Sequence, residues 1–242
     1  MPIPRLRPTQ PRFRCRSILG LVDEADVRRS ARPAGESPCD TRRSAAYCGS
    51  VPLLTATDAL PQRPRRVVVA GTSAAGKTTL AVRIGELLAI PHVEIDALFH
   101  GPAWTPRETF AAEVEAFSAE PNWVTEWQYS TVRALLAARA DLLVWLDVSR
   151  AAVMRRVVRR TVRRRLRRQV LWNDNIEPPL WTVFTDPEHI VRWAWSTHHK
   201  TAQRVVAVHQ QRPDLVIVRL AGQRAVEQWI SGPLQRAAAR SV

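Results

Sequence analysis

Residues 66–79 read RVVVAGTSAAGKTT, and this stretch decides the fold. Its first five residues include three consecutive valines, a pattern typical of a buried parallel strand. The next residues fit the pattern GxxxxGK[ST], in which two glycines let the backbone turn tightly and a lysine adds a cation. A helical apolar pattern follows, so a helix would direct its positive end at a bound anion. The stretch predicts a phosphate-binding loop, with a ligand-free glycine-rich turn as the alternative.

The loop residues have separate expected roles. Lys77 would reach the β- and γ-phosphates of a nucleoside triphosphate, and Thr78 would offer its hydroxyl to Mg²⁺. Lys77 is one of two lysines in a chain rich in arginine, which suggests that its position requires an ammonium group. The residues expected to bind the nucleotide are Gly71, Thr72, Ser73, Ala74, Ala75, Gly76, Lys77, Thr78 and Thr79.

Composition divides the chain into three parts. Residues 1–64 hold nine of the 18 prolines and little periodicity, which favours a disordered basic extension or a start codon set too early. We expect a folded domain over residues 65–232 and a flexible tail over residues 233–242. The three cysteines are widely spaced and indicate neither a disulfide framework nor a zinc site. No apolar run approaches the roughly 20 residues that span a bilayer, and no signal peptide is evident, so we expect a cytoplasmic protein without a membrane partner.

Five apolar runs alternate with helical patterns after residue 65, which predicts an α/β fold with a parallel sheet and helices on both faces. The helix after the loop is expected over Thr78–Leu88. Another is expected from Thr105, as its N-cap, to Ser118, and a third from Asp186 and Pro187 to Gln211. The expected strands are Arg66–Ala70, His92–Ile95, Asn122–Thr125, Leu142–Leu146 and Leu215–Leu220, and the other expected helices are Val132–Arg139, Arg150–Arg168 and Arg224–Ile230.

Three acidic residues follow predicted strands, and each could be the metal-side acid, the carboxylate that helps Thr78 to bind Mg²⁺. They are Asp96, Glu126 and Asp147, and the residues alone do not choose among them. Asp96 could also accept a proton from a phosphate acceptor or orient that acceptor, whereas the simpler interpretation is a turn cap. Phe99, His100 and Trp104 follow closely and could line an acceptor pocket or belong to the core.

The segment from Arg150 to Arg168 holds ten arginines and no acid. Without it, residues 67–242 carry a net charge of −3, so the basic character is local. Pairs of arginines recur every four residues and form one broad face of a helix. This face could bind phosphates, remain solvated, or contact a nucleic acid.

The motifs resemble the adenylate-kinase-like group of P-loop nucleoside and nucleotide kinases. The resemblance covers about residues 65–231 and is greatest to a bacterial branch described as DNA topology modulation or AAA-type ATPase proteins. It is carried by the loop and by IDALF (95–99), WVTEWQYS (123–130), LVWLDVSRAAVMRRVVRR (143–160) and LWNDNIEPPLWTVFTDPEHIVRWAWSTHHK (171–200).

The resemblance implies a P-loop NTPase three-layer sandwich with strand order 2-3-1-4-5 and a helical lid at about 155–185. It favours Glu126 as the metal-side acid, although the branch usually has Asp-Gly-Asn-Tyr where this chain has Glu-Trp-Gln-Tyr. It implies that Arg156 and Arg160 close over the phosphates, that Asp96 faces the acceptor, and that Gly222 passes the adenine ring.

The sequence therefore predicts a protein that binds ATP and Mg²⁺ and moves the γ-phosphoryl group to a small acceptor such as a nucleoside, nucleotide or related metabolite. The expected catalytic residues are Lys77, Asp96, Glu126, Arg156 and Arg160. The alternative is a nucleotide-gated, DNA-binding ATPase that uses the arginine-rich helix.

Overall fold

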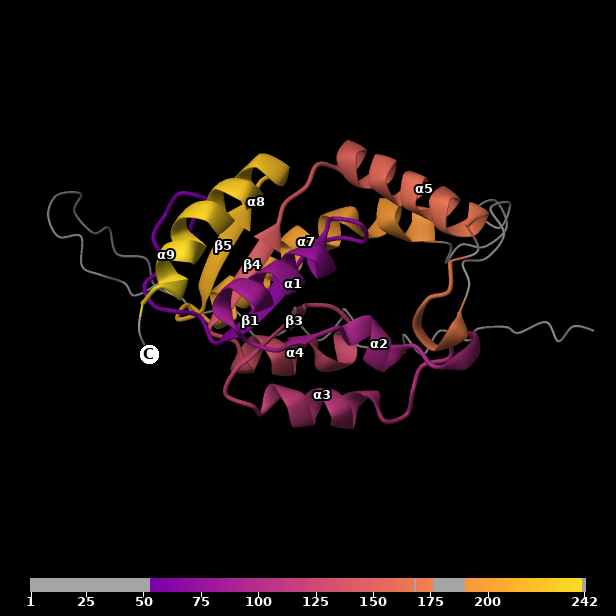
Figure 1. The fold of residues 1–242 in the computed structure, drawn as a ribbon, viewed down its shortest axis with the longest axis horizontal. Helices are drawn as coiled ribbons and strands as arrows, with labels where there is room; N and C mark the ends of the chain where they lie inside the picture. Colours follow the sequence, from indigo (N-terminus) through magenta and orange to yellow (C-terminus); the bar gives the residue numbers. More distant parts are fainter. Residues whose placement is uncertain (1–52, 168, 176–189, 241–242) are drawn as a thin grey trace, which may run out of the picture. The chain divides into compact units, whose positions relative to one another are not determined.

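A computed structural model describes residues 53–167, 169–175 and 190–240. Its strands form one five-stranded sheet in which every neighbouring pair is parallel (Figure 1). The order β2-β3-β1-β4-β5 confirms the predicted topology. The strands are β1 (Arg66–Ala70), β2 (His92–Val93), β3 (Trp123–Glu126), β4 (Leu142–Leu146) and β5 (Val216–Leu220).

Helices connect the strands and continue to the end of the described chain. The longer ones are α1 (Lys77–Leu88), α3 (Phe110–Ser118), α4 (Ser130–Arg139), α5 (Arg150–Leu166) and α7 (Ile190–Gln211). The shorter ones are α2 (Ile95–Phe99), α8 (Gln223–Trp229), α9 (Gln235–Ala238), the 3-10 turns η2 (Pro102–Trp104) and η3 (Trp172–Asp174), and the π-helical turn η4 (Ile230–Leu234).

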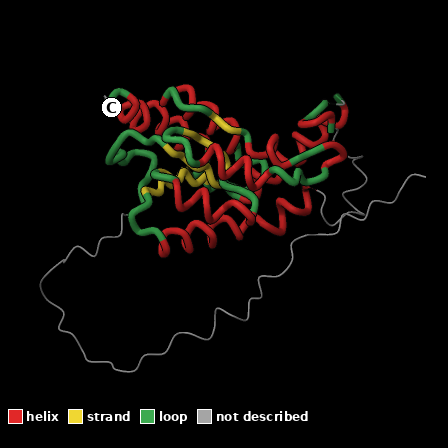
Figure 2. Tube along the Cα trace, turned by 90° about the horizontal axis from the view of Figure 1, so that it is seen from below, coloured by secondary structure: helices red, strands yellow, loops and turns green. Residues whose placement is uncertain are grey.

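Strand β1 is buried on both faces because helices cover both sides of the sheet, as Figure 2 shows from a second direction. Side chains alternate along a strand. Val67 and Val69 join a core cluster with residues of α1, α5 and α8, whereas Val68 and Ala70 join another with residues of α3 and α4. Helix α7 contributes to both clusters. The described elements therefore form the predicted three layers, and the apolar run of β1 lies at their centre.

Two predicted boundaries near β2 and α3 are wrong. Strand β2 ends at Val93, and Ile95 instead begins α2, where its N–H donates to the buried Glu126 carboxylate at 3.2 Å. Helix α3 begins at Phe110, whereas Thr105 donates its hydroxyl to the Pro102 carbonyl at 2.7 Å. The Thr105 carbonyl accepts from Gly101 N–H. These bonds close the loop between α2 and α3, so Thr105 does not cap a helix.

The described structure extends beyond the limits expected for the folded domain. Leu54 pairs with Val218 beside β5, and Leu60 is buried in the core. At the other end, Leu234 and Ala237 are buried, and the helical turns continue to Ala238. Part of the expected lid and the expected helix start at Asp186 and Pro187 lie outside the described residues. Among the described helices, none is both long enough and apolar enough to cross a membrane.

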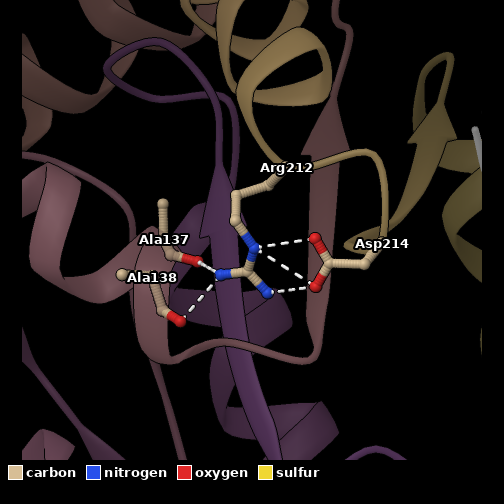
Figure 3. A network of polar contacts seen from close by, with 4 residues as sticks. All are labelled: Ala137, Ala138, Arg212 and Asp214. Atoms are coloured by element: carbon tan, nitrogen blue, oxygen red, sulfur yellow. Dashed lines mark hydrogen bonds and ion pairs between the residues drawn. The ribbon is translucent and has the colours of Figure 1, made fainter.

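Arg212 joins two connections that are distant in sequence (Figure 3). Its guanidinium donates to the carbonyl oxygens of Ala137 at 2.9 Å and Ala138 at 2.7 Å, in the last turn of α4. It also donates to both carboxylate oxygens of Asp214, in the turn between α7 and β5. A cation at a helix C-terminus opposes the negative end of the helix dipole. Arg212 therefore fixes the end of α4 against the start of β5.

We expect Arg212→Ala to lower the free energy of unfolding by about 1–3 kcal/mol, because two helix-terminal carbonyls lose a charged donor. Urea unfolding followed by circular dichroism measures the change. Arg224→Ala, at an exposed arginine on α8, is the matched control and should alter stability by less than about 0.5 kcal/mol. Equal losses in the two variants would contradict this role of Arg212.

Candidate functional site

The loop predicted to bind phosphate lies at the carboxyl end of β1. A Cβ atom at Gly71 would lie 3.1 Å from the Ala75 Cβ and 3.2 Å from the Leu146 Cβ, so only glycine fits there without a shift. Ala74 and Gly76 have φ values of 58° and 106°, which reverse the backbone over a few residues. Helix α1 then begins at Lys77. Backbone turns of this kind followed by a helix N-terminus form anion-binding concavities.

The ammonium of Lys77 is held at this loop. Its Nζ donates to the Thr72 carbonyl at 3.2 Å. Burial lowers the pKa of Lys77, the nearby carboxylates of Asp96 and Glu126 act in the opposite direction, and Arg160 lowers it further. Lys77 therefore lies within electrostatic reach of two acids and one cation, which places three sequence-predicted site residues around the loop.

Glu126 ends β3, directly beside β1, and its side chain is only 2% exposed. His92 Nε2 lies 3.3 Å from its carboxylate, and the Ile95 N–H donates to it at 3.2 Å. Burial alone would raise the pKa of Glu126. Hydrogen bonds from His92, from the Ile95 backbone and from the Thr78 side chain outweigh burial and hold that pKa below its ordinary value. The structure thus brings an ionised carboxylate to the Thr78 hydroxyl.

Asp147 follows β4, which also borders β1, so strand order alone does not separate it from Glu126. Arg219 on β5 donates to Asp147 through Nε at 2.8 Å, and this ion pair is partly exposed. The Arg219 guanidinium also lies over the Trp145 ring, 5.2 Å from its centroid. The carboxylate of Asp147 is therefore engaged with β5, whereas that of Glu126 meets Thr78.

Asp96 lies in the first turn of α2, and its side chain bonds across the site instead of capping that helix. Gln128 and Tyr129 both donate to its Oδ1, the Tyr129 hydroxyl at 2.6 Å. The Tyr129 hydroxyl also lies 3.2 Å from His100 Nε2. Burial and the adjacent Asp96 charge raise the pKa of Tyr129, so its phenol stays protonated as a donor. Gln128 and Tyr129 were not predicted as site residues, although both lie in the quoted stretch WVTEWQYS.

Aromatic rings surround this acid. Phe99 stacks on Tyr129 with ring centroids 3.9 Å apart. His100 meets Trp104 edge to face at 5.1 Å and stacks with Trp172 at 5.8 Å. These rings therefore pack against one another and against the segment that follows α5. They also lie beside Asp96.

The segment Leu171–Asn175 is fixed to the loop between α2 and α3 by a buried amide. Asn175 is 4% exposed. Its Oδ1 accepts from the Trp104 N–H at 2.9 Å, and its Nδ2 donates to the carbonyls of Gly101 at 3.0 Å and Trp172 at 2.8 Å. Asn173 also donates to the His100 carbonyl. Sequence reasoning missed Asn175, because two of its partners, Gly101 and Trp104, lie more than 70 residues earlier in the chain.

Two arginines of α5 also contact the loop that is predicted to bind phosphate. Arg156 Nη1 donates to the Ala75 carbonyl at 3.0 Å, and Arg160 Nη2 lies 3.4 Å from Ser73 Oγ. These are the two positions selected by the resemblance. Gly222 follows β5 with a φ of 88° and precedes α8, and Thr79 is exposed on α1. Within the described residues, no hydrogen bond joins Gly222 or the Thr79 side chain to Lys77, Asp96 or Glu126.

The residues at this loop fit a nucleotide and its magnesium ion. Cationic side chains of Lys77, Arg156 and Arg160 meet at a helix N-terminus, which is the chemistry that polyphosphate requires. Thr78 and Glu126 supply oxygen donors, the type that Mg²⁺ prefers. Within the described residues no group of three His, Cys, Asp or Glu side chains could bind a metal, so the ion would complete its coordination with phosphate and water.

No protein-family model and no curated protein matches the sequence. Among solved structures, the chain resembles a gluconokinase from Sinorhizobium meliloti 1021 with 19% identity and a TM-score of 0.43, over 73% of this chain and 95% of that one. A shikimate kinase from Acinetobacter baumannii in complex with shikimate gives 13% identity and a TM-score of 0.40, over 72% and 88%. A sugar kinase from Janibacter sp. HTCC2649 gives 17% and 0.39, over 73% and 92%. Similarity at this level assigns no activity to the chain.

We expect Asn175→Ala to increase amide hydrogen exchange of Trp104 at least about tenfold, because its N–H and two carbonyls lose a buried partner. Hydrogen–deuterium exchange read by NMR or mass spectrometry measures the change. Asn122→Ala is the matched control, since its side chain makes no hydrogen bond to the described residues. Unchanged exchange over residues 100–104 in Asn175→Ala would contradict the proposed fixation.

Proposed function

We propose that the chain binds Mg-ATP and transfers the γ-phosphoryl group to a hydroxyl of a small acceptor, such as a nucleoside, nucleotide or related metabolite. The position of Lys77 carries this proposal. Its ammonium bonds to the loop and lies in the field of Asp96 and Glu126. Lys77 thus bonds to the loop and interacts electrostatically with two carboxylates that have different partners. This arrangement suits transfer between a nucleotide and a second molecule, whereas a simple anion site needs no such acids.

On the phosphate side, the backbone of Gly71–Thr79 and Lys77 would hold the β- and γ-phosphates. Arg156 and Arg160 would stabilise the negative charge that spreads over the transferred group, through directional hydrogen bonds. Their contacts to Ala75 and Ser73 already hold both guanidinium groups at the loop. Without these two arginines, stabilisation of the developing anion would depend on Lys77, the loop backbone and the metal ion.

Thr78 and Glu126 would hold the magnesium ion. When bound, the ion neutralises phosphate charge and fixes the orientation of the phosphates. The lowered pKa of Glu126 keeps its carboxylate ionised for this role. Gly222, at the carboxyl end of β5, would approach the adenine ring with its backbone, a role proposed from the resemblance alone.

On the acceptor side, Asp96 would receive or orient the proton of the attacking hydroxyl. The acceptor oxygen bonds to the γ-phosphorus, the bond from that phosphorus to the β-phosphate oxygen breaks, and ADP leaves. Tyr129 and Gln128 donate to one oxygen of Asp96 and would hold its orientation. The side chains of Phe99 and His100 would exclude water from this reaction.

We expect Lys77→Ala to reduce acceptor-dependent ADP formation at least about 100-fold, because a charge that stabilises the transferred group is lost. A coupled ADP assay with a panel of nucleosides, nucleotides and sugars measures the rate, and calorimetry measures ATP binding. Lys200→Ala changes the other lysine of the chain, exposed on α7, and should keep wild-type values. Failure of the wild-type protein to bind ATP would contradict the proposed function.

We expect Asp96→Asn to keep ATP affinity within about threefold while transfer slows about 100-fold or more, because the acceptor loses its proton partner. The same assay and calorimetry separate the two effects. Asp147→Asn is the matched control, since Asp147 is engaged by Arg219, and it should preserve both quantities. ADP formation that no acceptor increases and that Asp96→Asn leaves unchanged would favour hydrolysis over transfer.

A further inference from the structure

Helix α5 carries arginines at several positions around its axis, because consecutive residues of a helix are about 100° apart. Val153, Val157 and Thr161 are buried and face the domain. Arg156 and Arg160 flank this buried side and contact the phosphate-binding loop. A second set of arginines points away from the buried side. Its members are four residues apart and therefore share one helix face. This outward arginine stripe consists of Arg155, Arg159 and Arg163, all exposed.

The outward arginine stripe has the charge and spacing of a backbone-binding surface. Each four-residue step rises about 6 Å, so the stripe extends about 12 Å along the helix. One strand of duplex DNA carries a phosphate about every 3.4 Å along the duplex axis. A stripe of this length that lies along the axis can therefore reach three or four consecutive phosphates of one strand. No acid occurs between Arg150 and Arg168. Within the part of the chain that the structure describes, no ion pair is formed by these three side chains.

We propose that the outward arginine stripe binds the phosphate backbone of a nucleic acid. Guanidinium groups bind phosphate through paired hydrogen bonds, and charge neutralisation alone supplies sequence-independent affinity. Val153 and Val157 are buried against the domain, and the exposed large apolar side chains of α5 are Val158 and Leu166. Two such side chains offer little apolar area to enter a bilayer, so an anionic membrane suits this surface less well. The arginines of the stripe are not those that contact the loop, so ATP and nucleic acid can be bound together.

The test is fluorescence anisotropy with a labelled 20-base-pair DNA duplex, using the full chain over a series of salt concentrations. We compare the wild type with the triple variant R155Q/R159Q/R163Q. The matched control R65Q/R224Q/R236Q removes the same charge from exposed arginines outside α5. The stripe variant should bind at least about tenfold more weakly at low salt, and the slope of log affinity against log salt should become shallower by about 2–3, reflecting three lost phosphate contacts. The control triple should retain most of the affinity and slope.

Two further arms separate the sources of binding. Single-stranded RNA and DNA of equal length show which backbone is preferred, and calorimetry should show unchanged ATP binding by the stripe variant. Lys77→Ala should keep the DNA affinity of the wild type, because it changes only the nucleotide side. Equal losses in the two triple variants would overturn the proposal, as would an unchanged slope in the stripe variant. Binding to vesicles of anionic lipid without binding to any oligonucleotide would also overturn it.

Discussion

The site depends on one buried carboxylate and the groups that keep it charged. Glu126 lies at the end of β3, and its oxygens meet His92 of β2, the backbone N–H of Ile95 at the start of α2, and Thr78 in the first turn of α1. A buried charge without such partners would be costly, so these bonds also hold the surrounding elements in place. The register that pairs Val69 with Glu126 fixes the height of this carboxylate beside the loop. The positions of Glu126 and of the loop over residues 71–79 therefore follow from one strand pairing.

Most of the fold could be predicted, because its determinants are local. The apolar run of β1, the glycines of the loop and the alternation of elements lie within short stretches, and the strand order followed from the family resemblance. The start of α3 could not be predicted, since the Thr105 pattern matches a helix cap and the competing bonds come from Pro102 and Gly101. Propensity at one residue was overridden by closure of a seven-residue loop between Phe99 and Arg107.

The candidate site divides in the same way. The loop carries motif spacing, whereas Glu126 and the two arginines of α5 were selected by the family resemblance, and the structure shows the contacts of each. Tyr129 and Asn175 carry no spacing signal, because their roles arise from partners about 33 and 71 residues away. The arginines of helix α5 also fall into two groups that composition alone does not separate. The arginine-rich segment is uniform in sequence, but packing of one side against the domain separates the arginines at the loop from those facing outward.

The most direct test of the central claim is a crystal structure of the full chain with Mg²⁺ and a non-hydrolysable ATP analogue. The β- and γ-phosphates should lie against the backbone of residues 71–79, the Lys77 ammonium should contact them, and the metal ion should lie between Thr78 and Glu126. A nucleotide bound elsewhere, or a metal ion held at Asp147 with Glu126 unengaged, would contradict that claim.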